Sequence, residues 1–317
     1  MLKLDFINVG DGDAILIRET GPGEADYVML VDCGRPHIEF VPGSKRRHAL
    51  NYLMREGIGR IDLMVLTHLH FDHIGGAPAL LHHFPVGRLM ALYLPPEGAK
   101  WVFAPESDEK TIIGMCDALN LFRDIVDIAR EKGSACVEAK NGAEALTQRL
   151  KLTVYRPDDA LALRQKEAFD ALYLGKSPPR GELYAVSKER NCSSLIVRLE
   201  YAGRSVLLTG DSYADYWEGS EQGRCDILKL PHHGDGKSMT EKLVKSLAPS
   251  YAVVSCQNDT STKKERPSAE VIAAVQKHVP NVLCTENREL PTLSASMREA
   301  VRLAVGEDGV ITGPRGI

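Results

Sequence analysis

No apolar stretch in this 317-residue sequence approaches the ~20 residues that an α-helix needs to cross a bilayer. The N-terminus also lacks a basic segment followed by an apolar one, because residues 2–7 already follow the apolar pattern of a strand. These two absences argue against a membrane span and against a signal peptide. We therefore expect a cytoplasmic protein with no membrane partner.

Paired cysteines are absent as well. The seven cysteines are odd in number, scattered singly and never arranged as CxxC, which argues against a disulfide framework and a zinc knuckle. No Walker-type loop and no dinucleotide-binding fingerprint is present. The formal net charge of −4 argues against sequence-independent binding of nucleic acid over a broad surface, but it does not exclude a local basic groove. Two basic clusters, 45–48 and 263–266, are candidates for flanking an anionic substrate, although such runs are usually solvated.

Short β-branched segments bounded by glycine or proline alternate with helical patterns along the chain. We expect strands at 2–9, 13–18, 27–32, 61–66, 88–94, 150–155, 194–201, 204–209, 226–230, 251–255 and 281–284. We expect helices at 45–57, 111–132, 158–174, 239–247 and 268–278, and a loop at 175–181. Because both halves contain strand groups followed by helices, the pattern predicts two sheets packed face to face and covered by helices. We expect one domain over 1–317, with an insertion at about 95–190.

The densest group of candidate ligands follows the apolar segment 61–66. His68 and His70 stand two residues apart, so that on an extended loop both rings point the same way, and Asp72 and His73 lie one turn further on. Three imidazoles and a carboxylate suit zinc or a similar first-row divalent ion, with manganese as the alternative. A polar surface loop would require these four potential ligands to gather by chance. The motif therefore predicts a metal site.

A fifth candidate ligand, Asp211, follows the apolar run 205–209 and is expected at a strand end, as is the loop that holds His68. A carboxylate there can bridge two cations, and two ions ~3.5–4 Å apart can hold both the attacking and the leaving oxygen of a displacement. An isolated aspartate at a strand end is more often a cap or turn residue. The other ligands favour the metal role.

These motifs resemble those of the metallo-β-lactamase superfamily, whose HxHxDH signature is matched by residues 68–73. Further family motifs are similar, in order, to Val-Asp-Cys-Gly at 31–34, Leu-Leu-Thr-Gly-Asp at 207–211 and Leu-Pro-His-His-Gly at 230–234. The segment 8–17 narrows the resemblance to the soluble hydrolase domain of the ComEC competence family, over about 1–90 and 190–290. The resemblance implies an α/β fold, the four-layer αββα sandwich of two mixed sheets flanked by helices. It also implies two divalent ions, zinc foremost, and hydrolysis by metal-bound hydroxide.

His232 and His233 are adjacent, so on an extended backbone their side chains would point to opposite sides and only one would bind the metal directly. We favour His233, because the following glycine allows a close approach and similar superfamily motifs place the ligand before glycine. His232 is then free to donate a proton or contact a substrate oxygen, and we name it with Asp72 as a candidate catalytic residue. The reverse assignment of the two histidines stays open.

Two more aspartates, Asp13 and Asp32, are expected behind the ligands, because metal-bound histidines usually donate their outer N–H to a carboxylate. For Asp13, which lies in a glycine-rich segment, a turn role is the alternative. Many superfamily members carry a further histidine before the bridging aspartate, but none lies between His83 and Asp211 here. Asn191 is the nearest candidate in that region. One ion would then have only two histidines, the bridging aspartate and water, and we expect it to be held less tightly.

Hydrolysis is the reaction that the resemblance implies. The resemblance to ComEC-like domains implies a phosphodiester in a small molecule or in nucleic acid as the substrate, and tetrahedral phosphoryl oxygens suit two ions. A hydrolase of carboxylic esters, lactones or β-lactams would use the same ions on a planar carbonyl. A redox protein of this fold usually has an additional acidic ligand and a flavin domain, and the sequence shows neither. A non-catalytic metal-binding module is the third alternative, because the further histidine is missing.

Overall fold

The computed structural model describes residues 1–21, 25–39, 41–104, 109–219, 222–258, 266–287, 290–293 and 296–316. Within these residues, one sheet is formed by β1 (Leu2–Ile7), β2 (Ile15–Glu19), β3 (Tyr27–Val31), β4 (Ile61–Leu66), β5 (Val86–Ala91), β6 (Ala135–Glu138), β16 (Ala300–Val305) and β17 (Ile311–Gly316). A second sheet is formed by β7 (Gly142–Ala145), β8 (Leu150–Tyr155), β9 (Ile196–Tyr201), β10 (Arg204–Leu208), β11 (Ile227–Lys229), β12 (Tyr251–Val254) and β13 (Asn281–Cys284). β14 (Glu286–Asn287) and β15 (Ser296–Met297) form a separate short pair.

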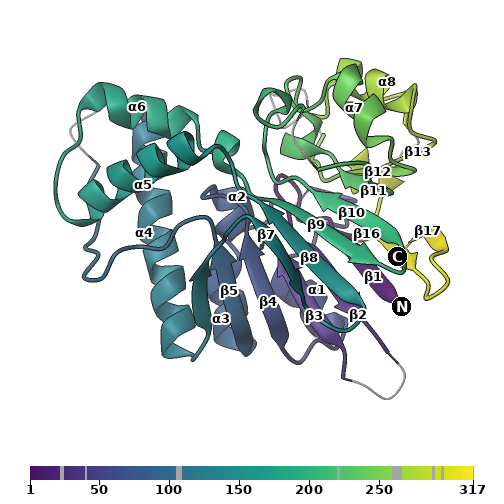
Figure 1. Cartoon of the computed structure of the whole chain (residues 1–317), viewed down its shortest axis with the longest axis horizontal. Coiled ribbons are helices and arrows are strands. Elements are labelled where there is room, and N and C mark those ends of the chain that lie inside the picture. The colour runs from purple at the N-terminus through teal and green to yellow at the C-terminus, as the bar shows by residue number, and fades with distance from the viewer. Residues whose placement is uncertain are drawn as a thin grey trace.

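The helices alternate with these strands. They are α1 (Ala49–Arg55), α2 (Phe71–Ile74), α3 (Ala77–His83), α4 (Lys110–Glu131), α5 (Asp159–Tyr173), α6 (Arg180–Lys188), α7 (Glu241–Leu247) and α8 (Ala269–Gln276). Three short 3₁₀ turns complete the set: η1 (Asn191–Ser193), η2 (Ala214–Tyr216) and η3 (Pro231–Gly234). Figure 1 shows how they surround the two sheets.

The two sheets share one pattern of strand pairing, antiparallel in one part and parallel in the other. In the order β17-β16-β1-β2-β3-β4-β5-β6, strands β1 to β3 pair antiparallel and β3 to β6 pair parallel. In the order β13-β12-β11-β10-β9-β8-β7, strands β7 to β10 pair antiparallel and β10 to β13 pair parallel. The expected hairpin at 202–203 joins β9 and β10, and both of its residues have positive φ, as a two-residue type I′ turn requires. Parallel strands place their carboxyl ends at one edge, which is where ligands of α/β proteins bind.

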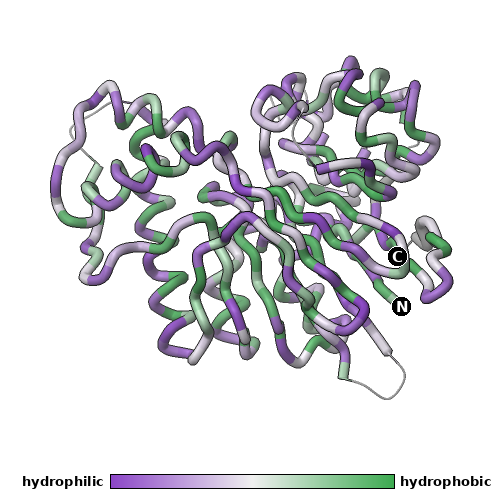
Figure 2. Tube along the Cα trace, viewed as in Figure 1, coloured by the Kyte–Doolittle hydropathy of each residue, from purple (hydrophilic) through white to green (hydrophobic). Residues whose placement is uncertain are grey.

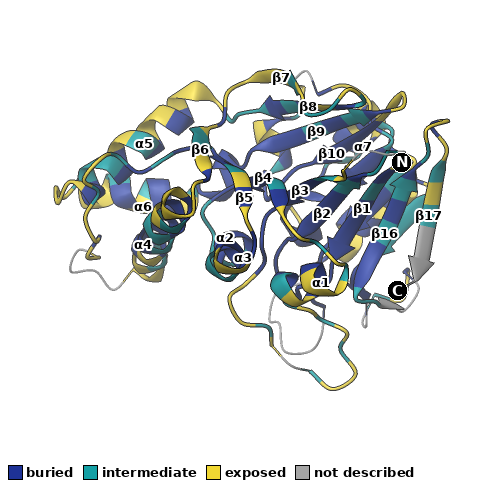
Figure 3. Ribbon diagram, turned by 90° about the horizontal axis from the view of Figure 1, so that it is seen from below, coloured by how far each residue is buried: buried dark blue, intermediate teal, exposed yellow. Residues whose placement is uncertain are grey.

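Buried apolar side chains form three clusters that divide the molecule into four layers. One cluster lies between the sheets, one packs α1, α3 and α4 on the eight-stranded sheet, and one packs α7 and α8 on the seven-stranded sheet. Figure 2 shows apolar residues concentrated along the strands, and Figure 3 shows buried strands beside the exposed outer faces of α1 and α4. The two mixed sheets flanked by helices confirm the predicted four-layer αββα arrangement.

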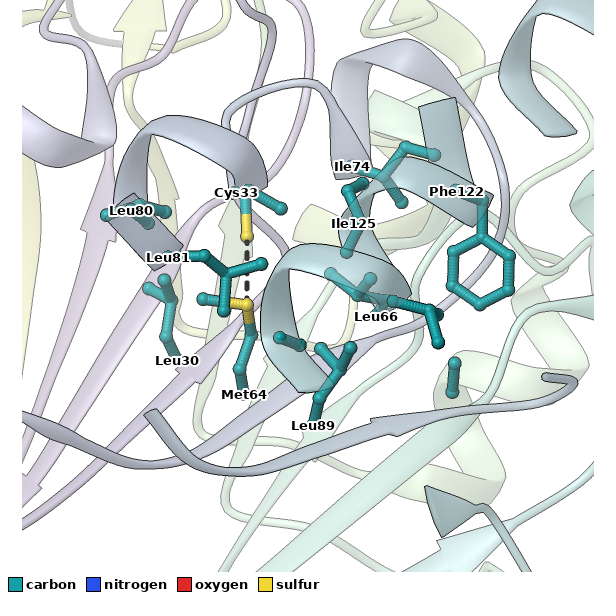
Figure 4. Close-up of a cluster of buried hydrophobic side chains, with 14 of the residues drawn as sticks. Leu30, Cys33, Met64, Leu66, Ile74, Leu80, Leu81, Leu89, Phe122 and Ile125 are labelled. Atoms are coloured by element: carbon teal, nitrogen blue, oxygen red, sulfur yellow. Dashed lines mark hydrogen bonds between the residues drawn. The ribbon is translucent and has the colours of Figure 1, made fainter. Parts of the chain in front are cut away.

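Figure 4 shows a part of this core that includes residues adjoining the predicted metal loop in sequence. Leu66 ends β4 just before the first histidines of the motif, Ile74 ends α2 just after the last one, and Cys33 follows Asp32. All three apolar side chains are buried in one cluster, where the Cys33 thiol donates to Met64 Sδ at 3.9 Å. Packing of these neighbours therefore fixes the backbone that carries the ligands.

The segment 95–190, expected to be an insertion, supplies β6 to one sheet and β7 and β8 to the other. Its helices α4, α5 and α6 pack on one another at the left of Figure 1, and α4 also packs on α3. α4 is 22 residues long, but neither it nor any other helix in the described ranges is both long and apolar enough to cross a membrane. The boundaries of the domain and of the insertion stay a prediction.

Several element boundaries differ from the sequence-based expectation. The helix expected at 45–57 begins only at Ala49, because tertiary contacts hold the preceding residues extended. The Arg47 N–H donates to the Asn8 carbonyl at 2.8 Å, and Arg46 pairs with the Glu286 carboxylate at 2.8 Å. α6 begins inside the expected loop 175–181, directly after Pro179. Strands β6, β7, β16 and β17 were not expected.

Candidate metal centre

The candidate ligands come from three loops that follow parallel strands of the two sheets. They are His68, His70, Asp72 and His73 after β4, Asp211 after β10, and His232 and His233 after β11. β4 belongs to one sheet, whereas β10 and β11 belong to the other. Because all three strands end at the same edge of the sandwich, residues far apart in the sequence meet there. The structure thus brings the predicted ligands together.

Asp72, His73, Asp211 and His233 form the first ligand group, in which one ligand atom from each residue lies within 4.8 Å of the others. His73 Nε2 is 3.3 Å from Asp211 Oδ1. His233 Nε2 is 3.5 Å from both Asp72 Oδ2 and Asp211 Oδ2. Two imidazole nitrogens and two carboxylates form a donor set that suits zinc or a similar divalent ion.

His68, His70 and Asp211 form the second ligand group. His68 Nε2 is 3.9 Å from Asp211 Oδ2 and 2.9 Å from His70 Nδ1. Asp211 therefore belongs to both groups and is placed to bridge two ions. Asn191, the candidate for the missing histidine, directs its amide nitrogen to His232 Nε2 at 3.1 Å. Its Oδ1 atom is buried and has no hydrogen-bond partner among the described residues.

Three ligand atoms of the first group are buried and lack any hydrogen-bond partner among the described residues: His73 Nε2, His233 Nε2 and Asp211 Oδ1. Leaving a buried polar atom without a partner is costly, by about 1–3 kcal/mol each. These three atoms belong to one compact group, so a single cation among them would satisfy all of them at once. The residues present therefore fit a divalent ion.

The carboxylates behind the ligands have different partners. Asp32 Oδ2 accepts from His73 Nδ1 at 2.7 Å and from Thr67 Oγ1 at 2.7 Å, which directs His73 Nε2 toward the first ligand group. Asp13 lies 3.8 Å from His73 Nδ1, but its main partner is the ammonium of Lys229. Asp13, Asp32 and His73 therefore lie together, and Asp13 also belongs to an ion pair that the sequence did not indicate.

Burial decides the protonation of the histidines in the second group. It lowers the pKa of His68 well below the ordinary value and lowers the pKa of His70 to about 3. Both imidazoles are therefore neutral near pH 7, as metal ligands must be. Burial also acts to lower the pKa of His73, but Asp211 and Asp32 outweigh it and hold this pKa well above the ordinary value.

The backbone of His232 and His233 is left-handed, with φ of 46° and 56°, and not extended as expected. His233 Nδ1 lies 3.0 Å from the Ser255 carbonyl, which leaves Nε2 facing the first ligand group. His232 Nε2 lies 2.6 Å from the Arg266 guanidinium and 3.1 Å from the Asn191 amide nitrogen, two donors, so this nitrogen is unprotonated. Burial, with the nearby Arg266 charge, lowers the pKa of His232 to about 4. The geometry favours His233 as the ligand, and the assignment stays a prediction.

Sequence analysis missed two buried cations beside the ligands, Lys229 and Arg190, and named a third cation, Arg266, only as part of a basic cluster. Lys229 is fully buried and is the one charge within the apolar run 227–230, a signal that could have been noticed. Arg190 is 9% exposed and immediately precedes Asn191, but no local pattern distinguishes it. Arg266 belongs to the basic cluster 263–266, whose other members lie outside the described residues. Only the tertiary structure places Arg190 and Arg266 beside histidines.

The sequence model of the metallo-β-lactamase superfamily matches residues 7–257. The chain belongs to this superfamily. It is 27% identical over 299 residues to ComE operon protein 3 of Bacillus subtilis, covering 90% of this chain and 32% of that protein. It is 24% identical over 256 residues to Recombination protein 2 of Haemophilus influenzae, covering 80% of this chain and 24% of that protein. These similarities confirm the resemblance to the ComEC family, and the chain spans only about a third or less of these relatives' length.

One solved structure of the superfamily shares the fold, and a second one is similar to this chain. Tm1679, a metal-dependent hydrolase of the β-lactamase superfamily, is 14% identical with a TM-score of 0.50, covering 96% of this chain and 99% of that one. YhfI of Bacillus subtilis, a metallo-β-lactamase fold protein, is 11% identical with a TM-score of 0.49, covering 90% of this chain and 96% of that one. The family match and the buried histidine and aspartate groups together make this chain a member of the superfamily with a candidate metal site. The identity and number of its ions stay predictions.

Proposed function

We propose that this protein hydrolyses phosphodiesters, either in small molecules or in nucleic acid, with two divalent ions, zinc or manganese. The observation that carries the proposal is that Asp211 belongs to two ligand groups at once. Two ions held by these groups would suit in-line displacement at phosphorus, where attacking and leaving oxygens lie on opposite sides. One curated relative is named a recombination protein, which is why nucleic acid is included among the candidate substrates.

The charge around the centre favours an anionic substrate over a neutral carbonyl compound. Arg266 reaches the site beside His232, and its guanidinium is largely buried, with 13% of the side chain exposed. It lies 3.8 Å from Asp11 and 3.6 Å from Asp235, which are long distances for ion pairs with carboxylates. A phosphodiester oxygen can take the place of these long contacts. A neutral ester, lactone or β-lactam gains much less from a guanidinium at this position.

Each side chain has a defined task in this proposal. When bound, divalent ions lower the pKa of a water toward ~7 and stabilise charge on the phosphoryl group. Asp211 and Asp72 supply carboxylate oxygens to the ions, and Asp32 keeps the His73 ring in the orientation that directs Nε2 to them. The unprotonated Nε2 of His232 can accept a proton, and a protonated His232 can donate to a phosphoryl oxygen or a leaving alkoxide.

Hydrolysis of chromogenic substrates by the metal-loaded protein tests the proposal. We expect metal-dependent cleavage of bis(p-nitrophenyl) phosphate, and no comparable cleavage of p-nitrophenyl acetate, a γ-lactone or a cephalosporin. Asp211→Asn should abolish turnover, whereas the same carboxylate-to-amide change at exposed Asp308 should leave it unchanged. Cleavage of only the carbonyl substrates would identify a carbonyl hydrolase. Bound metal without turnover on any of these substrates would favour a metal-binding module.

A further inference from the structure

Arg190 carries a buried positive charge that forms no ion pair with the described residues, although the Asp72 carboxylate is near enough to influence it. The residue is 9% exposed, and no carboxylate oxygen of the described residues lies within 4.0 Å of its guanidinium. Its Nε donates to the Ser187 carbonyl and its Nη1 to the Leu69 carbonyl, both at 3.2 Å. Burial lowers its pKa to about 10, so it remains a cation at neutral pH. Burying a charge that has no ion-pair partner costs free energy. An anion that binds beside Arg190 would offset this cost.

The guanidinium is held at the metal centre by its contact with Leu69, the residue between His68 and His70. Its charge is among the causes that lower the pKa of His70. This second ligand group has only three protein ligands, two of them histidines. An anion bound by Arg190 would therefore lie next to the second ligand group, which has fewer protein ligands than the first.

A cavity of about 40 Å³ opens beside Arg190, between the His68 loop and α5. His68 and Arg190 both line it, so the cavity and the second ligand group share a wall. Figure 1 shows α2 and α5 at the same end of the eight-stranded sheet. The volume is room for roughly three water molecules, which is enough for the two non-bridging oxygens of a phosphodiester.

The charges that line this cavity also favour an anion. Arg156, Lys166 and Arg190 face one carboxylate, that of Glu138. Lys166 is partly neutralised by Asp170 at 3.2 Å, but Arg156 Nε is buried and has no hydrogen-bond partner among the described residues. The cavity therefore offers two guanidinium groups with unused donor capacity, and guanidinium is the side chain best matched to phosphate oxygens.

We propose that this cavity is a phosphate subsite, in which Arg190 binds a non-bridging oxygen of the substrate's phosphate and Arg156, which lines the same cavity, assists. The inference rests on the proposed phosphodiesterase function and assigns a substrate-binding residue to it. A purely structural role for Arg190, bridging the Ser187 and Leu69 carbonyls, is the competing explanation. Binding of inorganic phosphate separates the two, since a structural bridge would not affect it in a correctly folded protein.

The test compares Arg190→Gln and Arg156→Gln with wild type, using Arg88→Gln as the matched control. Arg88 pairs with Glu144 at 2.7 Å, at the opposite end of β5, so its loss removes an arginine outside the cavity. Calorimetry of the metal-free proteins should show that Arg190→Gln weakens the binding of inorganic phosphate about ten- to hundredfold. Arg156→Gln should weaken it less, and Arg88→Gln should leave it unchanged. In the metal-loaded proteins, Arg190→Gln should raise KM for the phosphodiester with unchanged metal content.

Unchanged phosphate affinity in a folded Arg190→Gln protein, or no phosphate binding by wild type, would overturn the subsite. If Arg190→Gln does not fold, Arg156→Gln decides, and unchanged affinity in that variant also overturns it. The proposed function fails separately. If phosphate binding depends on Arg190 but no phosphodiester is cleaved, the subsite stands and the phosphodiesterase proposal is wrong.

Discussion

The ammonium of Lys229 lies against the carboxylate of Asp13, and the two side chains are only 0% and 1% exposed. Lys229 also donates to the Gly210 carbonyl at 3.0 Å and lies 3.9 Å from Asp211 Oδ1. It thus connects the loop before β2 with the loop that carries the bridging aspartate. Breaking a buried ion pair by removing one partner is far more costly than removing both.

Replacing Lys229 with methionine should therefore destabilise the protein by about 3–5 kcal/mol, because Asp13 is left buried without its cation. The double variant Asp13→Asn/Lys229→Met should recover a large part of that loss. Urea unfolding of wild type, both single variants and the double variant measures the coupling between the two residues. Losses that simply add would show that the pair does not act as a unit.

The two ligand groups should differ in affinity for the metal. The group of Asp72, His73, Asp211 and His233 has four protein ligands, whereas the group of His68, His70 and Asp211 has three. Titration of the loaded protein with a chelator should thus release one equivalent before the other, followed by elemental analysis at each step. His70→Ala should remove the weaker step and keep the tighter one. Loss of both ions in a single step would contradict this difference.

The adjacent histidines should have separable roles. His233→Ala should lower metal content, because His233 Nε2 lies among the atoms of the first ligand group. His232→Ala should keep the metal but lower kcat by about 10²-fold, a usual effect of losing one proton-transfer group. Metal content and kcat for bis(p-nitrophenyl) phosphate are measured for both variants. The opposite pattern would mean that His232 is the ligand.

An ion-pair network formed by Glu56, Arg302 and Arg18 should make the free energy of unfolding depend on pH. The Glu56 carboxylate accepts from Arg302 at 2.6 Å and from Arg18 at 2.8 Å. Burial acts to raise the pKa of Glu56, but the two guanidinium groups outweigh it and lower this pKa below its ordinary value of 4.5. The resulting stabilisation is complete above 4.5 and is lost as the pH falls through the lower folded value.

Glu56→Gln should accordingly lower the free energy of unfolding by about 1 kcal/mol at pH 7, since the network is partly exposed. The difference from wild type should shrink as the pH drops below Glu56's ordinary pKa. Urea unfolding at several pH values measures it, with Glu167→Gln, an exposed carboxyl of α5, as the control. A difference that stays constant down to pH 3 would contradict the role of the charge.

Local patterns were enough to predict the metal loop and most of the elements. His68, His70, Asp72 and His73 are close in sequence and follow an apolar strand, so their proximity needs no knowledge of the tertiary structure. Strands β6 and β7 were missed because they are short and mostly exposed, and thus lack the apolar pattern of a buried strand. Their place in the sheets depends on pairing with neighbours.

The features that sequence analysis got wrong or missed depend on distant contacts. The extended backbone expected at His232 and His233 is wrong, because neighbouring loops, including the contact of His233 with Ser255, hold both residues left-handed. The burial of Arg190 follows from α6, and from the backbone of the metal loop that it contacts. No spacing rule links such segments, because the contacts arise only when the two sheets pack together.

Strand β1 has partners from opposite ends of the sequence, since it pairs with β2 on one side and with β16 on the other. At about 5–20 residues per second, synthesis of the roughly 300 intervening residues takes on the order of 15–60 s. During that time the apolar strand β1 has one edge open to other chains. We therefore expect the eight-stranded sheet to close late and slowly on the ribosome, with β1 as the segment most in need of protection by a chaperone.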